Sequence, residues 1–371
     1  MILPGATIGV LGGGQLGRMF VTAARSMGYK TVVLDPDVNS PAGLIADQHI
    51  CAGFEDGNAL SKMAELCAAV TTEFENVPAA SLRKLAETVF VAPSAEAVEI
   101  AQHRAREKSY AREAGLETTA YGNILSTDDI AAAVAAAGFP SILKLSTLGY
   151  DGKGQAIVNS VEEVTEKFIE FGSVECVLEK MLDLKQEVSV ILGRNQAGDV
   201  AVFPLAENVH INGILHTSTV PANVSAEISS RAQQQAMALA KSMNYVGVLA
   251  VEFFITTDND LIFNEMAPRP HNSSHYTLDA TVTSQFEQQV RTLCGLAAGD
   301  GRLVSPVVMV NLLGDLWPLD WSKLLAEKAL KLHLYGKEEA RAGRKMGHFN
   351  VLAESAEQAK EIAQRVFKAI S

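Results

Sequence analysis

The chain opens with two short apolar segments separated by a helical segment, and this order restricts the fold more than any other feature of the sequence. Residues 6–11 (ATIGVL) and 30–34 (KTVVL) predict buried strands. Between them, a glycine-rich turn at residues 12–17 leads into a helix over residues 18–27, which ends at Gly28. A strand, a helix and a second strand joined by short connections form a parallel pair. The sequence therefore predicts a doubly wound α/β domain.

The same alternation continues to residue 103, and the pattern then changes twice. Up to residue 103 we expect further strands at 49–52, 69–72 and 89–91 and helices at 58–68 and 79–87. Residues 104–139 predict helices broken at Gly115 and Gly122. An α+β domain follows, with strands at 141–145, 174–181, 186–192, 200–206, 214–220, 247–255 and 261–265 and helices at 161–171 and 226–243. A small third unit has expected strands at 307–313, 330–335 and 347–353 and a helix at 355–370.

Length, charge and cysteine spacing narrow the class of protein. A chain of 371 residues is too long for one ordinary core and fits two or three domains. The net charge is −12 and no basic stripe occurs, so we expect no nucleic-acid partner. No run of about 18 apolar residues is present, and the first residues do not resemble a signal peptide, so we expect no membrane partner. Four scattered cysteines indicate a reducing cytoplasm.

The glycine-rich turn is the first motif that carries chemistry. Gly12, Gly14 and Gly17 have the spacing of a dinucleotide-binding turn, and Asp35 follows eighteen residues after Gly17. Glycines let a backbone approach a phosphate closely, and a helix N-terminus offers unpaired N–H groups to an anion. A nicotinamide or flavin cofactor, another phosphate-bearing ligand, and a tight turn without a ligand all remain open.

A second glycine-rich segment, residues 149–155 (GYDGKGQ), follows an apolar strand that carries Lys144. Backbone amides of such a loop can cover a polyphosphate, and Lys153 adds a positive charge. Lys144 would be costly to bury without a partner, and a phosphate would supply one. The segment therefore indicates a nucleotide flap, and a solvated hairpin with a surface lysine is the alternative.

Two glutamates lie within apolar strands. Glu252 interrupts the expected strand 247–255, and Glu265 ends the expected strand 261–265. Two buried carboxylates are hard to keep ionised unless a cation binds. A site in which a few protein oxygens bind the cation and phosphate oxygens complete its coordination shell is typical of Mg²⁺. A buried pair with Lys or Arg is the alternative. Asn264 precedes Glu265 directly, so the two side chains point to opposite faces unless the strand bends there.

Three further segments are less specific. In residues 267–275 (APRPHNSSH), two prolines hold Arg269 and His271 close to Glu265, where an arginine suits a planar carboxylate or bicarbonate. A stiff turn with solvated side chains is the alternative. Residues 179–182 (EKML) are able to contact an adenine through the backbone. Basic residues near the end of the chain suggest a phosphate clamp or an exposed loop, namely Lys337, Arg341, Arg344 and Lys345.

The order of these motifs resembles the ATP-grasp superfamily across nearly the whole chain. Five segments are similar to the 5-(carboxyamino)imidazole ribonucleotide synthases of purine biosynthesis, namely GGGQLGRM at 12–19, TTEFENV at 71–77, GYDGKGQ at 149–155, NEMAPRPHNS at 264–273 and GRKMGH at 343–348. The chain departs from that family's pattern at Ser274, where a glycine is expected. Serine is less free in its backbone angles, which bears on the geometry there and on any role of His275.

The resemblance implies a fold and a set of site residues. The fold is an N-terminal doubly wound α/β (pre-ATP-grasp) domain at 1–103, a central ATP-grasp domain at 104–300, and a small C-terminal α+β domain at 301–371 that binds the substrate phosphate. The implied ATP site is Arg104, Lys144, Gly149, Tyr150, Asp151, Gly152, Lys153, Gly154, Gln155, Glu179, Lys180, Met181, Leu182, Glu187, His210, Asn264 and Glu265. Mg²⁺ would bind Glu252 and Glu265. The residues implied at the reacting centre are Asp151, Arg269, His271 and Asn272. Those implied for the ribonucleotide are Gln15, Leu16, Glu73, Asn76, Tyr150, Lys337, Arg344 and Lys345.

The resemblance also implies a reaction. A ligase of this family uses ATP, Mg²⁺ and bicarbonate to carboxylate the 5-amino group of 5-aminoimidazole ribonucleotide through carboxyphosphate, giving ADP and phosphate, and it is expected to be a cytoplasmic homodimer. Asp151 would orient the amine or accept its proton. The alternatives are another ATP-grasp ligase, such as a formate-dependent glycinamide ribonucleotide transformylase or a biotin carboxylase-like protein, a nicotinamide-dependent oxidoreductase, and an inactive nucleotide-binding protein.

Overall fold

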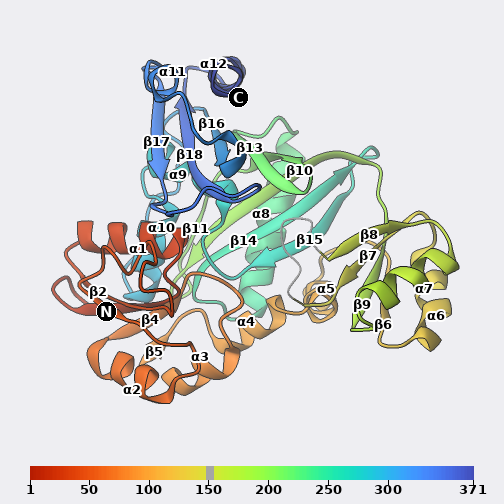
Figure 1. Cartoon of the computed structure of the whole chain (residues 1–371), viewed down its shortest axis with the longest axis horizontal. Helices are drawn as coiled ribbons and strands as arrows, with labels where there is room; N and C mark the ends of the chain where they lie inside the picture. Colours follow the sequence, from red (N-terminus) through yellow and green to blue (C-terminus); the bar gives the residue numbers. More distant parts are fainter. Residues whose placement is uncertain (148–153) are drawn as a thin grey trace.

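The computed structural model describes residues 1–147 and 154–371 and contains three sheets within them (Figure 1). The first is a five-stranded parallel sheet in the order β3-β2-β1-β4-β5. Its strands are β1 (Thr7–Leu11), β2 (Lys30–Leu34), β3 (Gln48–Ile50), β4 (Ala69–Thr72) and β5 (Phe90–Val91), and its helices are α1 (Gln15–Ser26), α2 (Gly57–Leu66), α3 (Ala79–Ala86) and α4 (Ala95–Ala101). The predicted doubly wound α/β domain is confirmed.

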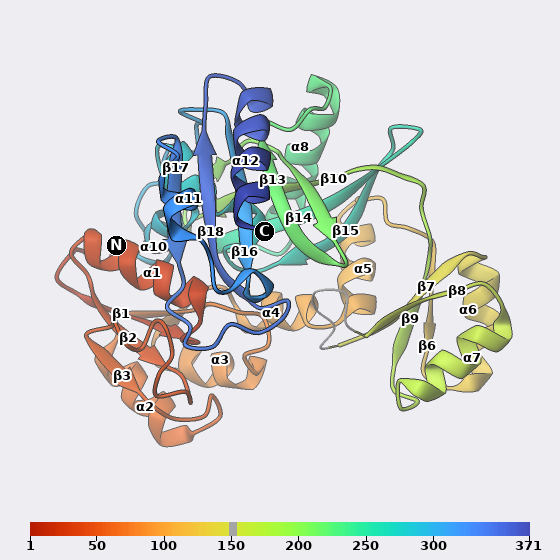
Figure 2. The ribbon, with the colours of Figure 1, turned by 45° about the horizontal axis from the view of Figure 1, so that its top comes forward.

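A four-stranded antiparallel sheet forms a subdomain within residues 121–180 that projects from the side of the molecule (Figures 1 and 2). Its order is β6-β9-β7-β8, with two helices packed on it. The elements are β6 (Tyr121–Ile124), β7 (Ser141–Leu145), β8 (Gln155–Val158), β9 (Cys176–Lys180), α6 (Ile130–Ala137) and α7 (Val161–Glu170), with a 3₁₀ turn η1 (Thr127–Asp129) before α6.

The expectation that residues 104–139 are helical was wrong for β6. Gly122 lies within this strand, where a Cβ atom would come 2.4 Å from the Cα atom of Ala133 in α6. The glycine therefore permits close packing of a strand on a helix, and it does not break a helix. Gly115, by contrast, has φ +88° just beyond helix α5 (Arg104–Glu113), which is the usual way a glycine ends a helix.

The third sheet has nine strands and runs through both the central and the C-terminal regions. Its order is β15-β14-β10-β12-β13-β16-β18-β17, and β11 pairs with β10. The strands are β10 (Leu184–Arg194), β11 (Val200–Val202), β12 (Ala206–Ile211), β13 (Ile214–Val220), β14 (Gly247–Thr256), β15 (Leu261–Ala267), β16 (Val307–Leu313), β17 (Leu330–Leu334) and β18 (Lys345–Leu352). In place of the single strand expected at 200–206, the structure has β11 and then β12, and β12 begins at residue 206 and continues to residue 211. The domain boundaries at 103/104 and 300/301 stay predictions.

Helices cover the large sheet and connect it to the first domain. Helix α8 (Ala226–Ser242) covers β10 and β14, and α11 (Trp321–Leu325) and α12 (Ala356–Ile370) cover the C-terminal strands. The sequence did not predict α10 (Gln285–Leu293), which packs on α1 and buries Phe286 and Val290 in the core of the first domain. The remaining short elements are η2 (Asn272–Ser274), α9 (Thr277–Ala280) and η3 (Gly314–Leu316). Among the described residues, no helix is long and apolar enough to cross a membrane.

Serine residues fix where several helices begin. In each case the hydroxyl accepts a hydrogen bond from the backbone N–H three residues later, which satisfies one of the donors that a helix N-terminus leaves free. These capping residues are Ser94 (α4), Ser160 (α7), Ser225 (α8), Ser284 (α10) and Ser355 (α12). Local capping therefore sets the start of helices from all three regions of the chain.

Candidate active site

Glu252 and Glu265 face each other across neighbouring strands. They are direct partners in the register of β14 and β15, and the next pair is Phe253 with Phe263. Asn264 is therefore an extra residue, and the strand forms a β-bulge at this position. The sequence left open whether the strand bends at this point, and the bulge shows that it does. The alternation of side chains along a regular strand therefore does not decide which faces Asn264 and Glu265 point to.

The carboxylate pair fits a divalent cation. Burial, followed by the negative charge of Glu265, raises the pKa of Glu252 to about 8. Arg104 Nη1 lies 3.2 Å from Glu265 Oε2, so one positive charge already faces the pair. Within residues 1–147 and 154–371, no group of three His, Cys, Asp or Glu side chains could hold a metal. Two carboxylates are nevertheless suited to Mg²⁺ when phosphate oxygens complete its shell.

Two buried lysines lie beside this pair and share one carboxylate. Glu179, at the end of β9, accepts from Lys144 Nζ at 2.8 Å, and Lys108 Nζ lies 3.2 Å from its other oxygen. Burial alone would raise the pKa of Glu179, but the charges of Lys144 and then Lys108 lower it to about 2. Lys144, which the sequence assigned to the nucleotide, is therefore buried as an ion pair.

Helix α5 also holds the bulged strand, through residues that the sequence did not single out. Lys108 Nζ donates to the carbonyl oxygen of Asn264 at 3.2 Å, and Glu107 Oε1 accepts from the N–H of Met266 at 2.6 Å. The two adjacent side chains thus bind backbone groups on both sides of Glu265. Their sequence, in the polar helix RAREKSYARE, is typical of an exposed surface and gives no signal of burial.

Two neighbouring strands of the large sheet, β10 and β12, bring further predicted residues together. His210 Nδ1 in β12 lies 2.8 Å from Glu187 Oε2 in β10. Burial lowers the pKa of His210, but the hydrogen bond and charge of Glu187 outweigh it, and the net direction is upward. Met181 is exposed, and Leu182 is half-buried, directly after β9. His210 is thus paired with a carboxylate and is not simply a packed residue.

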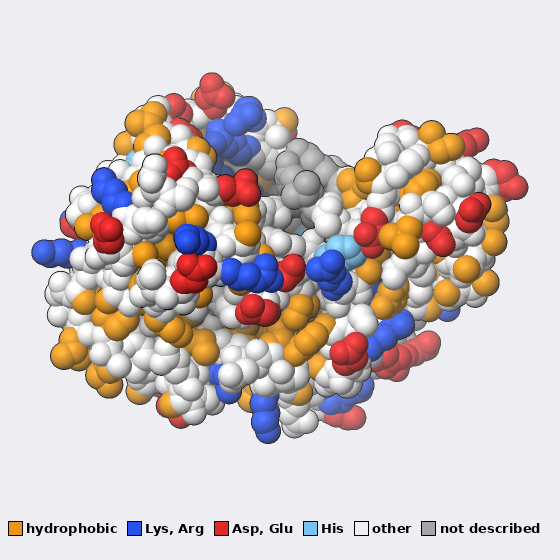
Figure 3. Space-filling view, turned by 90° about the horizontal axis from the view of Figure 1, so that it is seen from below, with side chains coloured by type: hydrophobic (Ala, Val, Ile, Leu, Met, Phe, Trp, Pro, Cys, Tyr) orange, Lys and Arg blue, Asp and Glu red, His pale blue; other side chains and the backbone are white. Residues whose placement is uncertain are grey.

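The described part of the glycine-rich flap is short. Gly154 has φ +69°, and its carbonyl oxygen accepts from the N–H of Leu145 at 2.9 Å. Gln155 begins β8 and pairs with Lys144. The other predicted flap residues, Gly149, Tyr150, Asp151, Gly152 and Lys153, lie outside the described residues. Figure 3 shows that the surface is hollowed between the four-stranded subdomain and the rest of the molecule.

The N–H groups of the first glycine-rich turn are already bound by the protein. Glu73 accepts from the N–H of Gly14 at 2.5 Å and from that of Gly17 at 2.7 Å, and Asp35 accepts from Gly13 at 2.7 Å. Burial raises the pKa of Glu73, while the two N–H donors oppose that rise. Because these donors are occupied by carboxylates, the turn in this structure does not offer them to a dinucleotide phosphate.

The other residues predicted around this turn differ in exposure. Leu16 is buried in the core of the first domain, Gln15 is half-buried, and Asn76 is exposed. Arg269 forms an ion pair with Glu75, a residue of the 71–77 segment that the sequence did not single out. Burial would raise the pKa of Glu75, but the Arg269 charge lowers it to about 2. The first domain and the segment after β15 therefore meet at this pair.

The segment after β15 packs into the sheet. Asn272 is buried, and its side-chain amide makes two hydrogen bonds with Asn311 of β16, at 2.9 and 2.7 Å. This pairing makes Asn272 a residue that holds the segment in place. Ser274 is buried with a negative φ, so serine fits the position where glycine was expected without backbone strain. Burial moves the pKa of His271 well below its usual value.

The C-terminal basic residues lie in the segment that follows β17 and at the first residue of β18, which is Lys345. Lys337 Nζ donates to the carbonyl oxygen of Lys345 at 2.7 Å, and Arg344 Nη1 donates to that of Glu339 at 2.9 Å. Lys345 lies within electrostatic reach of Glu252 and His210, since its charge lowers the pKa of both. At least one basic residue of this cluster therefore lies near the carboxylate pair.

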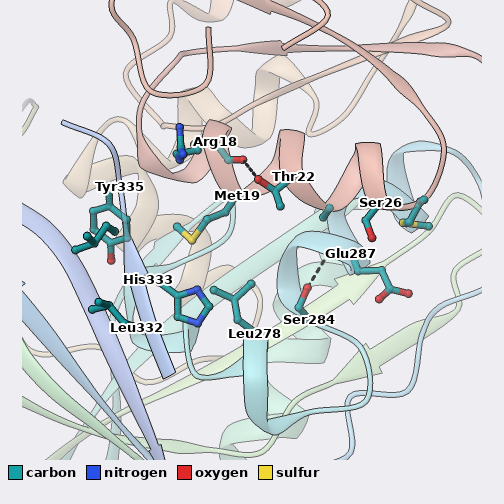
Figure 4. Close-up of a pocket in the computed structure, with 13 residues that line it drawn as sticks. Arg18, Met19, Thr22, Ser26, Leu278, Ser284, Glu287, Leu332, His333 and Tyr335 are labelled. Atoms are coloured by element: carbon teal, nitrogen blue, oxygen red, sulfur yellow. Dashed lines mark hydrogen bonds between the residues drawn. The ribbon is translucent and has the colours of Figure 1, made fainter. Parts of the chain in front are cut away.

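A separate cavity of about 450 Å³ lies between α1, β17 and residues of α9 and α10 (Figure 4). Arg18, Met19 and Thr22 line it from α1, facing Leu278 and His333. None of the residues that the sequence predicted for the site lines this cavity.

Three family models match successive parts of the chain. They describe a ribonucleotide synthetase preATP-grasp domain at residues 5–102, an ATP-grasp domain at residues 109–286 and a phosphoribosylaminoimidazole carboxylase C-terminal domain at residues 307–362. The expected three-domain layout of the ATP-grasp type is thereby confirmed.

Individual relatives agree over nearly the full length. The N5-carboxyaminoimidazole ribonucleotide synthase of Brucella melitensis is 46% identical over 350 residues, which cover 93% of this chain and 96% of the relative. A structure of the Staphylococcus aureus N5-carboxyaminoimidazole synthetase with ADP has a TM-score of 0.94 at 37% identity, covering 99% of this chain and 98% of that one. The Aspergillus clavatus synthase in complex with ADP and 5-aminoimidazole ribonucleotide has a TM-score of 0.92 at 30% identity, covering 98% of each. The chain belongs to the N5-carboxyaminoimidazole ribonucleotide synthase family.

Proposed function

We propose that this chain catalyses the ATP- and bicarbonate-dependent carboxylation of the 5-amino group of 5-aminoimidazole ribonucleotide, giving N5-carboxyaminoimidazole ribonucleotide, ADP and phosphate. The observation that carries the proposal is the half-buried Glu252–Glu265 pair, in which Glu265 is paired with Arg104 and Glu252 lies 3.5 Å from His271. The Aspergillus clavatus relative, described with ADP and 5-aminoimidazole ribonucleotide, supports the choice of substrates.

The nucleotide would lie between the four-stranded subdomain and the large sheet. Lys144 and Arg104 supply positive charge for its phosphates, and both are held in place by carboxylates. The carbonyl and N–H groups after β9 are suited to the adenine, and Glu187 with His210 to the ribose. Glu252 and Glu265 would hold Mg²⁺, which neutralises phosphate charge during phosphoryl transfer when it is bound.

Bicarbonate would bind beside Arg269 and His271. Attack of a bicarbonate oxygen on the γ-phosphate gives carboxyphosphate, and the chain's contribution is to position the anion and exclude water. Arg269 is oriented by Glu75, so its guanidinium is fixed before the anion arrives. Such preorganised charge is the main source of rate enhancement in reactions of this type.

The ribonucleotide phosphate would be bound by Lys337, Arg344 and Lys345. On the first domain, the N–H groups of Gly13, Gly14 and Gly17 are already used, so Gln15, Asn76 and backbone groups outside the turn are the contacts we propose. The same occupied N–H groups disfavour a nicotinamide cofactor. Asp151 as the group that orients the amine, a homodimer and a cytoplasmic location also stay proposals.

The decisive experiment measures ADP release with and without 5-aminoimidazole ribonucleotide, in bicarbonate-containing and bicarbonate-depleted buffer. We expect turnover to need both compounds for full rate and the product to carry ¹³C from labelled bicarbonate. A Glu265→Gln variant should lose turnover under all four conditions, because a metal ligand is removed. ADP release that ignores both compounds would exclude this function.

A further inference from the structure

A line of buried hydrogen bonds runs from His271 into the large sheet. His271 Nδ1 lies 2.9 Å from Ser273 Oγ, which lies 2.8 Å from Ser189 Oγ in β10. Asn208 Nδ2 in β12 lies 3.0 Å from Ser189 Oγ, and Ser218 Oγ in β13 lies 2.8 Å from Asn208 Oδ1. The two serines at 189 and 273, Asn208 and Ser218 are all buried, so water does not compete for these bonds.

One backbone group determines the direction of the whole line. The N–H of Ser273 donates to His271 Nδ1 at 3.3 Å, so this nitrogen accepts and carries no proton. The Ser273 hydroxyl, also in contact with Nδ1, must then donate to it as well. Ser273 Oγ is left to accept from the Ser189 hydroxyl, which in turn accepts from Asn208 Nδ2. Every donor and acceptor in the line is matched only in this direction.

The other neighbour of this nitrogen does not alter the assignment. Glu252 Oε1 lies 3.5 Å from His271 Nδ1, at the limit of hydrogen-bond distance and farther than the Ser273 hydroxyl. A neutral imidazole that accepts at Nδ1 carries its proton on Nε2. His271 Nε2 has no hydrogen bond to any described residue and is not among the buried atoms without a partner. It is therefore accessible to a ligand.

We propose that Ser273 is a positioning residue that fixes His271 as the Nε2–H tautomer, which presents a hydrogen-bond donor to an anionic oxygen of bicarbonate or carboxyphosphate. The inference rests on the proposed function and deepens it. The opposite tautomer would direct a lone pair at the anion and repel it. Ser273 holds Nδ1 through two donors, its backbone N–H at 3.3 Å and its hydroxyl in the shorter contact at 2.9 Å. The N–H sets Nδ1 as an acceptor, and the hydroxyl fixes the ring in the orientation that presents Nε2–H before the substrate binds.

The tautomer can be read directly from the free protein by two-bond ¹H–¹⁵N spectra after selective ¹⁵N-histidine labelling. The signals of His271 are those missing from a His271→Gln variant. We expect a protonated Nε2 and an unprotonated Nδ1. A protonated Nδ1 in the wild-type protein would overturn the proposal. This readout does not depend on any substrate, so it separates failure of the tautomer from failure of the proposed reaction.

Two serine variants separate positioning from stability. Ser273→Ala removes the hydroxyl at His271, whereas Ser218→Ala breaks one buried bond at the far end of the line, three links away. Both should lower the melting temperature, because Ser218→Ala leaves Asn208 Oδ1 without its donor and Ser273→Ala leaves the Ser189 hydroxyl without its acceptor. Only Ser273→Ala should lower kcat, by about tenfold, with the KM for ATP within about twofold of wild type. Equal kcat losses in both variants would show a merely structural role.

Discussion

Lys108 in helix α5 donates a hydrogen bond from Nζ to the carbonyl oxygen of Asn264, the bulge residue that precedes Glu265, at 3.2 Å. The same ammonium group lies 3.2 Å from Glu179, which also binds Lys144. One buried cation thus joins β15, which carries the carboxylate proposed to bind Mg²⁺, to β9, which ends at the proposed nucleotide site. Helix α5 therefore couples the geometry of two parts of the proposed active site.

Replacing Lys108 by methionine should destabilise the protein and weaken ATP binding. The side chain keeps its length, but Glu179 loses one of two cations and the Asn264 carbonyl loses its donor. Breaking a buried pair in this way lowers the free energy of unfolding by about 3–5 kcal/mol. Urea denaturation measures this change, and initial rates measure the expected rise in KM for ATP.

The matched control is Lys84→Met, because Lys84 is an exposed lysine paired with Glu87 within a helix turn. It should change the free energy of unfolding by less than about 1 kcal/mol. If the Lys108 variant were no less stable than this control, the contacts of Lys108 with Asn264 and Glu179 would contribute nothing to the free energy of unfolding.

Lowering the pH should lower the free energy of unfolding, because Glu179 becomes protonated. Burial alone would raise the pKa of its carboxyl, but Lys144 and Lys108 lower it to about 2, below the value of 4.5 expected in the unfolded chain. A carboxyl with a depressed folded pKa stabilises the protein above the unfolded value, and this contribution is lost as pH falls towards 2. The contribution is about 3 kcal/mol at neutral pH.

Carboxyl ¹³C spectra of glutamate-labelled protein check this prediction. The Glu179 signal, identified by its absence from Glu179→Gln, should stay at its ionised position at about pH 3.5, where exposed glutamates are largely protonated. A signal that shifts together with those of the exposed glutamates would contradict the proposed ion-pair cluster.

The glycine turn makes a sharper steric prediction. A Cβ atom on Gly14 would lie 2.4 Å from Glu73 Oε1, the oxygen that accepts from the Gly14 N–H. Gly14→Ala should therefore displace Glu73 and lower the free energy of unfolding by about 1–3 kcal/mol. Thermal denaturation with and without 5-aminoimidazole ribonucleotide would show the loss of stability and of ligand-induced stabilisation.

Gly57→Ala is the control for this substitution. Gly57 begins α2 and does not have a positive φ, and a Cβ atom added there would meet no heavy atom within 4 Å. Alanine should therefore be neutral or slightly stabilising at this position. If Gly14→Ala were as stable as Gly57→Ala, the contact between Glu73 and the turn would not constrain Gly14.

The sequence predicted those site residues whose chemistry conflicts with their local pattern. Glu252 and Glu265 stand out because charged residues interrupt apolar strands, and Lys144 stands out in the same way. Glu107 and Lys108 do not, because their helix is polar throughout and their burial comes from contact with β15 and, for Lys108, with Glu179 of β9. Their role depends on tertiary packing, and no periodicity of α5 reveals it.

The glycine turn shows a second limit of sequence reasoning. The spacing of Gly12, Gly14 and Gly17 predicted a close approach to the backbone, and such an approach occurs. The approaching groups are Glu73 and Asp35 of the protein itself, each of which directly follows another strand of the parallel sheet. A local motif predicts that backbone N–H donors are available, but the groups that accept from them belong to residues distant in the sequence.

Lys337→Ala should weaken binding of the ribonucleotide far more than binding of ATP. Lys337 is held by the carbonyl oxygen of Lys345, in the loop between β17 and β18 that carries Arg344. Loss of one charge-assisted contact to a phosphate corresponds to a rise in KM for 5-aminoimidazole ribonucleotide of about 10- to 100-fold. The KM for ATP should stay within about twofold, because the ATP phosphates are proposed to bind Lys144 and Arg104 and not this loop. Lys331→Ala, at an exposed position on β17, is the matched control and should change neither constant. Equal increases in both KM values for the Lys337 variant would exclude a phosphate clamp and indicate a general disturbance of the loop.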